Sequence, residues 1–385
     1  KNLSFTSNLS ESIGNADMVF ISVNTPVKKF GVGAGESSDL KWVESSARQI
    51  SKYSRDHTIV VEKSTLPVRT AKVIKDILDA AEIEDHSANE RKSFSVLSNP
   101  EFLAEGTAID DLVNPDRVLI GGDDQSAIDK LVEIYKNWVP NQKIIRTNLW
   151  SSELSKLTAN AFLAQRISSI NSISAICEST GADVNQVAEA IGLDSRIGER
   201  FLSAGPGFGG SCFKKDILNL VYLCKHYKLF EVARYWENII NINSWQQNRI
   251  YELVVSKLFG NLAGKSIAIL GFAFKANTND TRESPSINIC RNLLNEGASL
   301  IINDPKVSLK TIKRDLSDFK FCETKTKSMP ESSWAYSSDI YKSVEGTDAV
   351  IVLTEWDAYK DLDWQKISNI MRKPAWVFDT RSILD

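Results

Sequence analysis

The chain has 385 residues, a formal net charge of −3, 42% hydrophobic residues and 25% charged residues, a composition typical of globular proteins. No apolar run approaches the ~18 residues of a membrane span, and a near-neutral charge without a basic block argues against nucleic-acid partners. Five scattered cysteines without a CxxC pair argue against a zinc site or a disulfide framework, so we expect no metal and a reducing, cytoplasmic compartment.

The N-terminal part of the chain alternates predicted strands with predicted helices. Apolar runs typical of buried parallel strands cover residues 16–23, 58–61 and 94–97, and each halts at a polar segment. Apolar residues at three- and four-residue spacing predict helices over 41–51 and 67–81. In such a βαβ arrangement ligands bind at the carboxyl ends of the strands, so the polar segments predict a binding site.

An all-α region is predicted next, beginning with a long helix over 151–180. Its apolar stripe consists of Leu154, Leu157, Ala161, Ala164, Ile167, Ile170, Ile173 and Ile176. The three-residue spacing of the isoleucines drifts around a helix of 3.6 residues per turn, so we expect more than one packing neighbour. Further helices are predicted over 183–192 and 213–227.

The βαβ pattern returns near the C-terminus. Strands are predicted over 266–271, 300–304, 347–354 and 375–382, with a helix over 286–295. Ser284 is suited to cap that helix, Pro285 to occupy its first position and Gly297 to follow its end.

The two copies of the pattern differ in length. Residues 347–354 resemble 16–23, but 77 residues separate Gly271 from Asp348, whereas 16 precede Asp17. By this repeat we expect that roughly 60 residues of the first domain, with the dinucleotide-phosphate loop, are absent from the sequence. The expected fold is α/β, with two doubly wound sheets joined by a central all-α domain that contains a long helix. The expected domains are 1–149, 150–259 and 260–385.

One glycine-rich segment has the composition of a reaction centre. The run Gly205-Pro206-Gly207-Phe208-Gly209-Gly210-Ser211-Cys212 precedes a predicted helix with two lysines in its first turn. A helix N-terminus and nearby ammonium groups stabilise the thiolate form of a cysteine, and glycines let the backbone approach a ligand. We therefore predict a nucleophilic Cys212, with a buried structural cysteine as the alternative. Packing alone is expected for Cys177, Cys224, Cys290 and Cys322.

Motifs spread over nearly the whole chain resemble one family. They are Asn24-Thr25-Pro26, Glu62-Lys63-Ser64-Thr65, residues 98–106, Asn114-Pro115-Asp116-Arg117, residues 152–156, Asn160-Ala161-Phe162, the Cys212 segment, residues 271–275, residues 280–284 and Phe378-Asp379-Thr380-Arg381. They resemble the UDP-glucose/GDP-mannose dehydrogenase family, and most closely its animal-type UDP-glucose 6-dehydrogenases. The resemblance implies a Rossmann-like NAD-binding domain, a helical dimerisation domain and a Rossmann-like UDP-sugar-binding domain. It also implies a homo-oligomer with a dimer as its unit, for which a hexamer is one assembly.

The implied reaction is the oxidation of UDP-glucose to UDP-glucuronate with two NAD⁺. Cys212 would attack the aldehyde to give a thiohemiacetal, and a second oxidation would give a thioester that water cleaves. Lys156 and Asn160, four apart on one helix face, would stabilise the oxyanion, although such a pair alone is typical of a solvated face. Asp216 would assist proton transfer, with Thr65 as a water contact; an acid in a first helical turn is otherwise a dipole partner.

Glu101 and Glu105 also lie four apart, on a short helix that we expect Asn99 and Pro100 to start. By resemblance, Glu101 serves thioester hydrolysis as an acid or base, and Glu105 lies toward the nicotinamide. The backbone of Phe102, Leu103 and Ala104 would contact the sugar. Two carboxylates in such a loop can instead be capping and surface charges.

The resemblance implies two sets of binding residues. The nucleotide sugar would be bound by Glu101, Phe102, Leu103, Ala104, Glu105, Lys156, Asn160, Arg196, Phe201, Gly205, Phe208, Gly209, Phe274, Lys275 and Arg381, the last matching an arginine supplied by a neighbouring subunit. The cofactor NAD would be bound by Val23, Asn24, Thr25, Pro26, Ser64, Thr65, Glu105, Cys212, Lys215 and Arg282. Pyrophosphate favours such cations, although a lone Arg or Lys is more often a solvated charge, and Arg282 could instead pair with Asp280 or Glu283.

Two departures from the family pattern are visible. Ser203 stands where animal-type relatives carry a lysine in the substrate pocket, and no G-x-G-x-x-G motif follows a strand of the first domain. One alternative is a 6-dehydrogenase for another nucleotide sugar, such as GDP-mannose or UDP-N-acetylmannosamine. Another is a catalytically silent oligomerisation partner that binds nucleotide sugar but no NAD. The joint presence of Cys212, Lys156, Asn160 and Asp216 argues against the silent partner.

Overall fold

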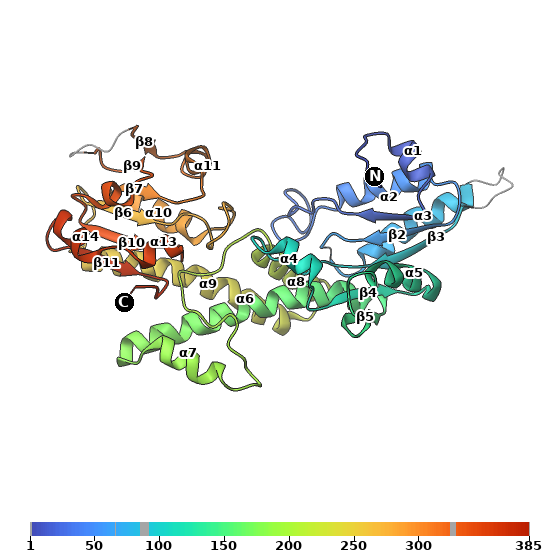
Figure 1. The fold of residues 1–385 in the computed structure, drawn as a ribbon, viewed down its shortest axis with the longest axis horizontal. Coiled ribbons are helices and arrows are strands. Elements are labelled where there is room, and N and C mark those ends of the chain that lie inside the picture. Colours follow the sequence, from blue (N-terminus) through green and yellow to red (C-terminus); the bar gives the residue numbers. More distant parts are fainter. Residues whose placement is uncertain (1, 66, 85–91, 324–328, 385) are drawn as a thin grey trace. The chain divides into compact units, whose positions relative to one another are not determined.

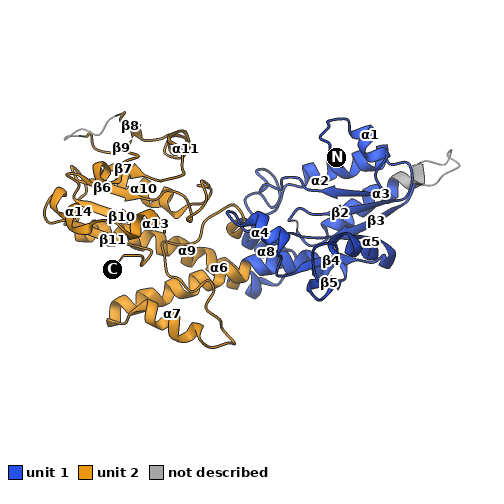
Figure 2. Cartoon of the chain, viewed as in Figure 1, with its two compact units in different colours: residues 1–160, 215–234 blue, residues 161–214, 235–385 orange. Residues whose placement is uncertain are grey.

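The computed structural model describes residues 2–65, 67–84, 92–323 and 329–384 (Figure 1). The chain forms two compact units, coloured separately in Figure 2. The first unit contains residues 1–160 and 215–234, and the second contains residues 161–214 and 235–385. In the part of the chain that is described, no helix has both the length and the apolar character needed to cross a lipid bilayer.

The first unit is built on a sheet whose described strands are β1 (Met18–Ile21), β2 (Thr58–Glu62), β3 (Phe94–Ser98), β4 (Val118–Gly122) and β5 (Ile144–Thr147), in that spatial order. β1, β2 and β3 are parallel, β4 is antiparallel to β3, and β5 is parallel to β4. The strands predicted over 16–23, 58–61 and 94–97 are thus confirmed as β1, β2 and β3. Because these three are parallel, their carboxyl ends lie at one edge of the sheet.

Helices cover both faces of this sheet, and those that the structure describes are α1 (Leu9–Gly14), α2 (Lys41–Tyr53), α3 (Thr70–Glu84), α4 (Ala108–Val113) and α5 (Gln125–Tyr135), with a 3₁₀ turn η1 (Asn141–Lys143) before β5. Val60 of β2 packs in one core with α2 and α3, and Ile59 and Val61 pack in another with α5. Burial on both faces explains why β2 is a continuous apolar run. The helices predicted over 41–51 and 67–81 are confirmed, although α3 begins later because Arg69 adopts a φ of 78°.

The described helices of the central region are α6 (Leu149–Thr180), α7 (Val184–Gly192), α8 (Phe213–His226) and α9 (Phe230–Lys257). The predicted helices over 151–180, 183–192 and 213–227 are therefore confirmed, and α9 adds one that the sequence did not predict. The side chain of Asp183 accepts the first N–H groups of α7 and so fixes its start. α6, α8 and α9 each begin in one unit and end in the other.

The apolar stripe predicted on α6 is partly wrong. Leu157, Ala161, Ala164 and Ile170 are buried, but Leu154 and Ile176 are exposed. The buried face also carries polar side chains at helical spacing, namely Glu153, Lys156, Asn160, Ser168 and Asn171. A stripe drawn from apolar residues alone misplaces its ends, because polar residues take several of the core-facing positions.

The second unit carries a parallel sheet of described strands β6 (Ser266–Leu270), β7 (Ser299–Asn303), β8 (Lys320–Phe321), β9 (Ser333–Tyr336), β10 (Ala349–Val352) and β11 (Trp376–Asp379), in the order β11-β10-β6-β7-β9-β8. Its helices in the described residues are α10 (Pro285–Asn295), α11 (Leu309–Asp315), α12 (Ile340–Val344), α13 (Asp357–Lys360) and α14 (Trp364–Ile370) (Figure 1). The predicted start of α10 is confirmed, because Ser284 caps it and Pro285 is its first residue. Gly297 follows its end with a φ of 91°.

The sequence repeat appears in the structure as a repeated strand pair. β1 pairs in parallel with β2, and β10 pairs in parallel with β11. On its other side β10 pairs with β6, whose connection through α10 to β7 is the predicted βαβ unit. The expected α/β fold with parallel strands and a helical central region is therefore confirmed.

Candidate active site

The carboxyl edge of β1 and β2 brings together residues of two predicted cofactor motifs. The Val23 N–H donates to Ser64 Oγ (2.9 Å), and Ser64 Oγ donates to the Val23 carbonyl (2.8 Å). The buried Thr25 hydroxyl donates to the Thr65 carbonyl (3.0 Å). These contacts join the segments that follow the two strands, as expected for loops at the ligand edge of an α/β sheet.

Lys215 joins this edge from α8. Its Nζ donates to the Thr25 carbonyl (3.3 Å) and to Thr25 Oγ1 (3.2 Å). Of the other predicted cofactor residues in this segment, Asn24 is exposed and Pro26 is half-buried. The edge therefore carries hydroxyls, an amide and an ammonium group, a polar set that fits the nicotinamide and ribose parts of a dinucleotide.

Lys156, Asn160 and Asp216 are all buried in the first unit. Asn160 Nδ2 donates to Asp216 Oδ2 (2.5 Å), and Lys215 Nζ lies 4.0 Å from Asp216 Oδ1. Burial raises the pKa of Asp216, while Lys215, Asn160 and Lys156 lower it. The solvated-face alternative for Lys156 and Asn160 is thus excluded, and an exposed dipole partner is excluded for Asp216.

The short helix predicted from Asn99 and Pro100 is wrong. Residues 99–104 are not helical, and the next helix, α4, begins at Ala108. The reason lies in Asn99, which is fully buried and whose Oδ1, the atom that would cap a helix, instead accepts from Lys63 Nζ (3.1 Å) and the Tyr135 hydroxyl (2.6 Å). Glu101 instead accepts the Leu103 N–H at Oε2 (2.7 Å). Glu101 and Glu105 are therefore not one helical turn apart.

Phe102 lies beside Lys156, as the predicted sugar-binding set requires. The Lys156 ammonium lies 5.4 Å from the centre of its ring, and the Arg117 guanidinium lies 3.8 Å from it. An aromatic face attracts cations, so the ring helps to hold both side chains. Ala104, farther along the segment, donates its N–H to Asp111 Oδ2 (2.8 Å).

Lys63 lies beside Asn99 in the first unit, and no role was predicted for it from the sequence. Its Nζ donates to Asn99 Oδ1 (3.1 Å) and to the Tyr135 hydroxyl (3.2 Å), and the hydroxyl donates to Asn99 Oδ1 (2.6 Å). Burial lowers the pKa of Lys63 to about 8, against the opposing effect of Glu101. A lysine two residues after a buried apolar run was the available signal.

A buried pair of acids, Glu62 and Glu153, was also missed. Their carboxyl groups hydrogen-bond to each other, which requires a proton on one of them. Burial and the neighbouring Glu153 raise the pKa of Glu62 well above its ordinary value, and burial raises the pKa of Glu153 to about 7. Glu153 also accepts the N–H groups of Arg69 (2.6 Å) and Ala71 (2.8 Å), which anchors the start of α3.

In the second unit, the glycine-rich segment is held by side chains of two helices. The Gly205 N–H donates to Asn171 Oδ1 (2.8 Å), and the Gly205 carbonyl accepts from Gln246 Nε2 (2.9 Å). The Phe208 N–H donates to Asn243 Oδ1 (2.8 Å), and its carbonyl accepts from Asn243 Nδ2 (3.1 Å). None of these three amides was predicted, because a single polar residue within a helix belongs to no recognisable sequence motif.

Cys212 is exposed and lies immediately before α8. A buried structural cysteine, the alternative interpretation, is therefore wrong for this residue. Cys177, Cys224 and Cys290 are buried as expected, and Cys322 is half-buried. Of the two lysines in the first turn of α8, Lys214 pairs with Glu283 (2.9 Å).

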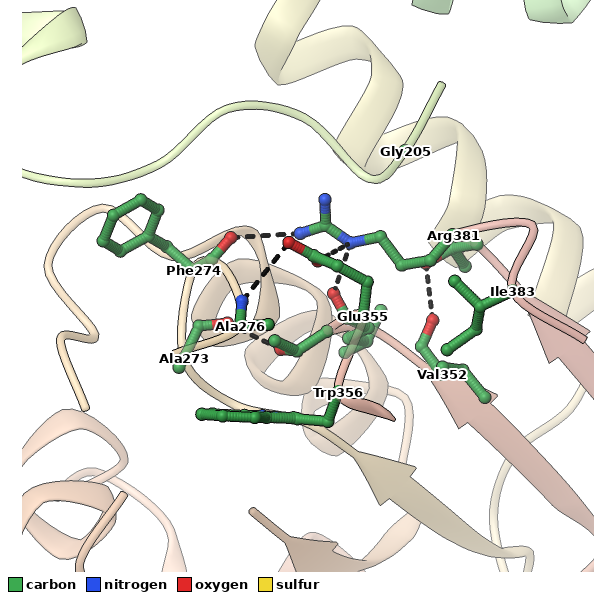
Figure 3. Close-up of polar contacts among 12 residues, drawn as sticks. Gly205, Ala273, Phe274, Ala276, Val352, Glu355, Trp356, Arg381 and Ile383 are labelled. Carbon is green, nitrogen blue, oxygen red and sulfur yellow. Dashed lines mark hydrogen bonds and ion pairs between the residues drawn. The ribbon is translucent and has the colours of Figure 1, made fainter. Parts of the chain in front are cut away.

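Arg381 lies inside the second unit, beside two other predicted substrate residues (Figure 3). Its guanidinium donates to the carbonyls of Leu353 (2.9 Å) and Phe274 (3.0 Å) and lies 3.2 Å from Glu355 Oε2. A Cβ built on Gly205 would lie 3.2 Å from Arg381 Nη1, so only a residue without a side chain fits there comfortably. These contacts bind the Arg381 guanidinium to residues of its own chain. That Arg381 also reaches the substrate site of a neighbouring subunit stays a prediction.

Two of the remaining predicted cations of the second unit, Arg282 and Arg196, form ion pairs. Arg282 pairs with Asp280 (2.8 Å), one of the two partners considered for it, and Arg196 pairs with Asp194 (2.6 Å) on a side chain that is 87% exposed. Phe201 is exposed with a φ of 64°, and Lys275 lies near the ring of Phe274.

Arg166 of α6 holds the loop that contains Arg196. Its guanidinium donates to the carbonyls of Ile197 (2.9 Å), Gly198 (2.6 Å) and Arg200 (2.8 Å). An arginine bound only by backbone carbonyls cannot be recognised from sequence, because carbonyls are present in every loop.

Three models of known protein families together match most of the chain. They are the NAD binding domain, the central domain and the UDP binding domain of the UDP-glucose/GDP-mannose dehydrogenase family, over residues 1–139, 150–245 and 268–385.

Individual relatives match over the same length. A UDP-glucose 6-dehydrogenase from Pongo abelii is 54% identical over 389 residues, which cover 100% of this chain and 77% of that protein. One from Drosophila melanogaster is 53% identical over 390 residues, covering 100% and 80%. Among solved structures, a UDP-glucose dehydrogenase from the archaeon Pyrobaculum islandicum is 31% identical, with a TM-score of 0.84 over 99% of this chain and 80% of that chain. The chain therefore belongs to the UDP-glucose/GDP-mannose dehydrogenase family and is an oxidoreductase that uses NAD.

Proposed function

We propose that the chain oxidises UDP-glucose to UDP-glucuronate in two steps, through a covalent intermediate on Cys212. The observation that carries the proposal is the buried hydrogen bond between Asn160 and Asp216 beside the equally buried Lys156. A buried ammonium, amide and carboxylate at one place are costly to desolvate, and such clusters are typical of functional sites. The identity of 53–54% to UDP-glucose 6-dehydrogenases supports UDP-glucose as the substrate.

The cofactor would be held at the carboxyl edge of β1 and β2 by Val23, Thr25, Ser64, Thr65 and Lys215. When bound, NAD⁺ takes up the hydride that leaves the sugar carbon in each oxidation. Polar side chains around that edge, and the ammonium of Lys215, fit this group. Arg282 and Glu105 are further candidates for contact with it.

Cys212 supplies the covalent step. Its sulfur forms a bond to the carbonyl carbon of the aldehyde, and the carbonyl oxygen gains a proton, which gives a thiohemiacetal. The second oxidation converts this into a thioester, water then adds to the carbonyl carbon, and the carbon–sulfur bond breaks to release the carboxylate and the thiolate. Lys156 and Asn160 stabilise negative charge on the oxygen.

Proton transfer falls to Asp216 and Glu101, with Thr65 as a contact for the attacking water. Burial raises the pKa of Asp216 above its ordinary value, a direction that favours a role in proton transfer. Phe102, Leu103, Ala104, Arg196, Phe201, Phe274, Lys275 and Arg381, with the glycine-rich segment from Gly205 to Gly209, bind the nucleotide sugar.

We also propose domain boundaries at 149/150 and 259/260, and we place the protein in the cytoplasm.

We further propose a homo-oligomer with a dimer as its unit. Large apolar side chains are exposed on α6 and α9, among them Phe162, Ile176, Tyr235 and Trp245. Apolar side chains gathered on helices are typical of subunit contacts. Light scattering after gel filtration tests this point, and a monomer at micromolar concentration would refute it.

The test of the reaction is the yield of NADH per nucleotide sugar. The unmodified chain should release two NADH per UDP-glucose, and Cys212→Ser should release at most one because no thioester can form. Cys322→Ser, a second cysteine that is not fully buried, serves as the matched control and should keep the full yield.

Each other result selects an alternative. An unchanged yield in Cys212→Ser refutes the covalent mechanism. Faster turnover of GDP-mannose or UDP-N-acetylmannosamine refutes UDP-glucose as the substrate. Calorimetric binding of UDP-glucose without any NADH release supports a silent partner.

A further inference from the structure

The glycine-rich segment is fixed by side chains although it has no regular secondary structure. Residues 202–209 are in neither a helix nor a strand, yet both backbone polar groups of Gly205 and both of Phe208 are hydrogen-bonded. All four bonds come from amide side chains. Asn171 lies on α6, and Asn243 and Gln246 lie on α9.

The three amides are buried, which separates them from ordinary surface contacts. Asn171, Asn243 and Gln246 are between 0% and 7% exposed. A buried amide is costly to desolvate, and here Asn171 Oδ1, Gln246 Nε2 and both polar atoms of the Asn243 side chain bond to the backbone of one loop. The amides sit on two long helices, whose own hydrogen bonds keep them rigid.

The segment also approaches the helices too closely to admit side chains. Gly207 has a φ of 124°, and a Cβ built on it would lie 2.6 Å from Asn243 Oδ1. A Cβ on Gly209 would lie 2.7 Å from the Glu283 carbonyl oxygen. Gly207 and Asn243 therefore depend on each other, because a side chain at Gly207 would displace the amide that bonds to the backbone of Phe208, whereas Gly209 lies against the segment before α10.

We propose that Asn171, Asn243 and Gln246 are positioning residues that hold the loop of Gly205 to Gly209 in the conformation that binds the nucleotide sugar. The inference rests on the proposed function, which places the sugar nucleotide against this loop. A loop held in advance loses little conformational entropy when the ligand binds, so the amides lower the dissociation constant without touching the ligand.

The chain contains a matched control for this proposal. Gln247 is the neighbour of Gln246 on α9 and is buried to a similar degree, but its Oε1 accepts from Asn288 Nδ2 (2.7 Å) and not from the loop. Gln247→Met therefore removes a buried amide of the same kind without removing a bond to the loop.

The experiment compares Asn243→Leu, Gln246→Met and Gln247→Met by titration calorimetry with UDP-glucose and by thermal denaturation. Asn243→Leu and Gln246→Met should raise the dissociation constant of UDP-glucose by roughly 10-fold or more, which corresponds to about 1.4 kcal/mol. Gln247→Met should change it less than about 2-fold at a comparable loss of melting temperature, and the KM for NAD⁺ should stay unchanged in all three. Equal effects of the three variants on UDP-glucose binding would overturn the proposal.

Hydrogen exchange of the unmodified chain gives a second test that does not depend on folding of the variants or on the reaction. The N–H groups of Gly205 and Phe208 should exchange at least about 100-fold more slowly than in an unstructured peptide. Asn243→Leu should accelerate Phe208 and leave Gly205 slow. If these N–H groups of the unmodified chain exchange as fast as in an unstructured peptide, the three amides do not hold the loop and the proposal is overturned. Failure of UDP-glucose to bind the unmodified chain would overturn the proposed function. The exchange rates would still show whether the three amides hold the loop.

Discussion

At the scale of single residues, the pair Glu62 and Glu153 links the fold to pH. The folded chain keeps a proton that the unfolded chain releases near pH 4.5, because the pKa of Glu153 rises from 4.5 to about 7 on folding. The free energy of unfolding should therefore fall as pH rises from about 4.5, and the contribution of Glu153 to this fall ends at about pH 7. At about 1.4 kcal/mol per pH unit, the loss is on the order of 3 kcal/mol.

Urea denaturation between pH 5 and pH 8 checks this expectation. Glu62→Gln keeps a hydrogen-bond donor for Glu153 but cannot ionise, so its free energy of unfolding should depend less on pH than that of the unmodified chain. Asp76→Asn, which removes an acid from an exposed ion pair with Lys72, is the control and should leave the pH dependence intact. A pH dependence that Glu62→Gln does not alter would contradict the shared proton.

Site residues that directly follow a strand could be predicted from the sequence, whereas those within a helix could not. Thr25, Ser64 and Thr65 were predictable because each follows an apolar strand, and strand ends are visible in sequence. Asn99 follows a strand too, but its side chain is buried and its Oδ1 accepts from Lys63 and Tyr135, so it starts no helix. Glu153 and Asn171 lie within a helix, where nothing in the sequence tells a buried amide or acid from a surface one.

At the scale of secondary-structure elements, Arg166 fixes the loop after α7 to the side of α6. Three hydrogen bonds from one charged group contribute about 1.5–3 kcal/mol each when they are buried, and less at this half-exposed site. Without them the loop should open more often. Arg166→Gln should therefore increase tryptic cleavage after Arg196 and Arg200 by roughly 10-fold, since cleavage follows the population of the open form.

Mass spectrometry of the first tryptic fragments measures this effect. Arg146→Gln removes an arginine from the ion pair with Asp129 in the first unit and is the control, because it should leave cleavage at Arg196 and Arg200 unchanged. Equal cleavage rates in the unmodified chain and in Arg166→Gln would show that the three carbonyl contacts do not restrain the loop.

The elements differ in how far the sequence defines them. β2 is buried on both faces and was predicted nearly to its ends, because Thr58 to Val61 form an unbroken apolar run. β5 was not predicted, since it is short and half-exposed and its residues, such as Arg146 and Thr147, mix apolar with polar types. Burial on both faces, not strand propensity, makes a strand readable from sequence.

At the scale of the whole molecule, the two units are tied together by shared helices. α6 contributes residues 149–160 to the first unit and 161–180 to the second, and α9 is divided at residue 234. A helix loses its hydrogen bonds cooperatively, so unfolding of one unit removes part of the packing surface of the other. We therefore expect one thermal transition instead of two.

Differential scanning calorimetry checks this expectation. A calorimetric enthalpy equal to the van't Hoff enthalpy would support one cooperative transition, whereas two resolved peaks would contradict it. Ala161→Pro places a break in α6 at the division between the units and should separate the transition into two. Ser195→Pro, at an exposed position in the turn from Asp194 to Ile197, should not.

The antiparallel direction of β4 offers a practical attachment point. Because β4 runs opposite to β3, the turn after it lies at the amino ends of β2 and β3, as the bond between Ser95 and Asp124 in that turn indicates. Asp123 is exposed there, at the sheet edge opposite to Ser64 and Thr65. A fluorescent reporter or affinity tag inserted after Asp123 would therefore be carried at a distance from the cofactor edge, so immobilised or labelled protein should keep the turnover of the free chain.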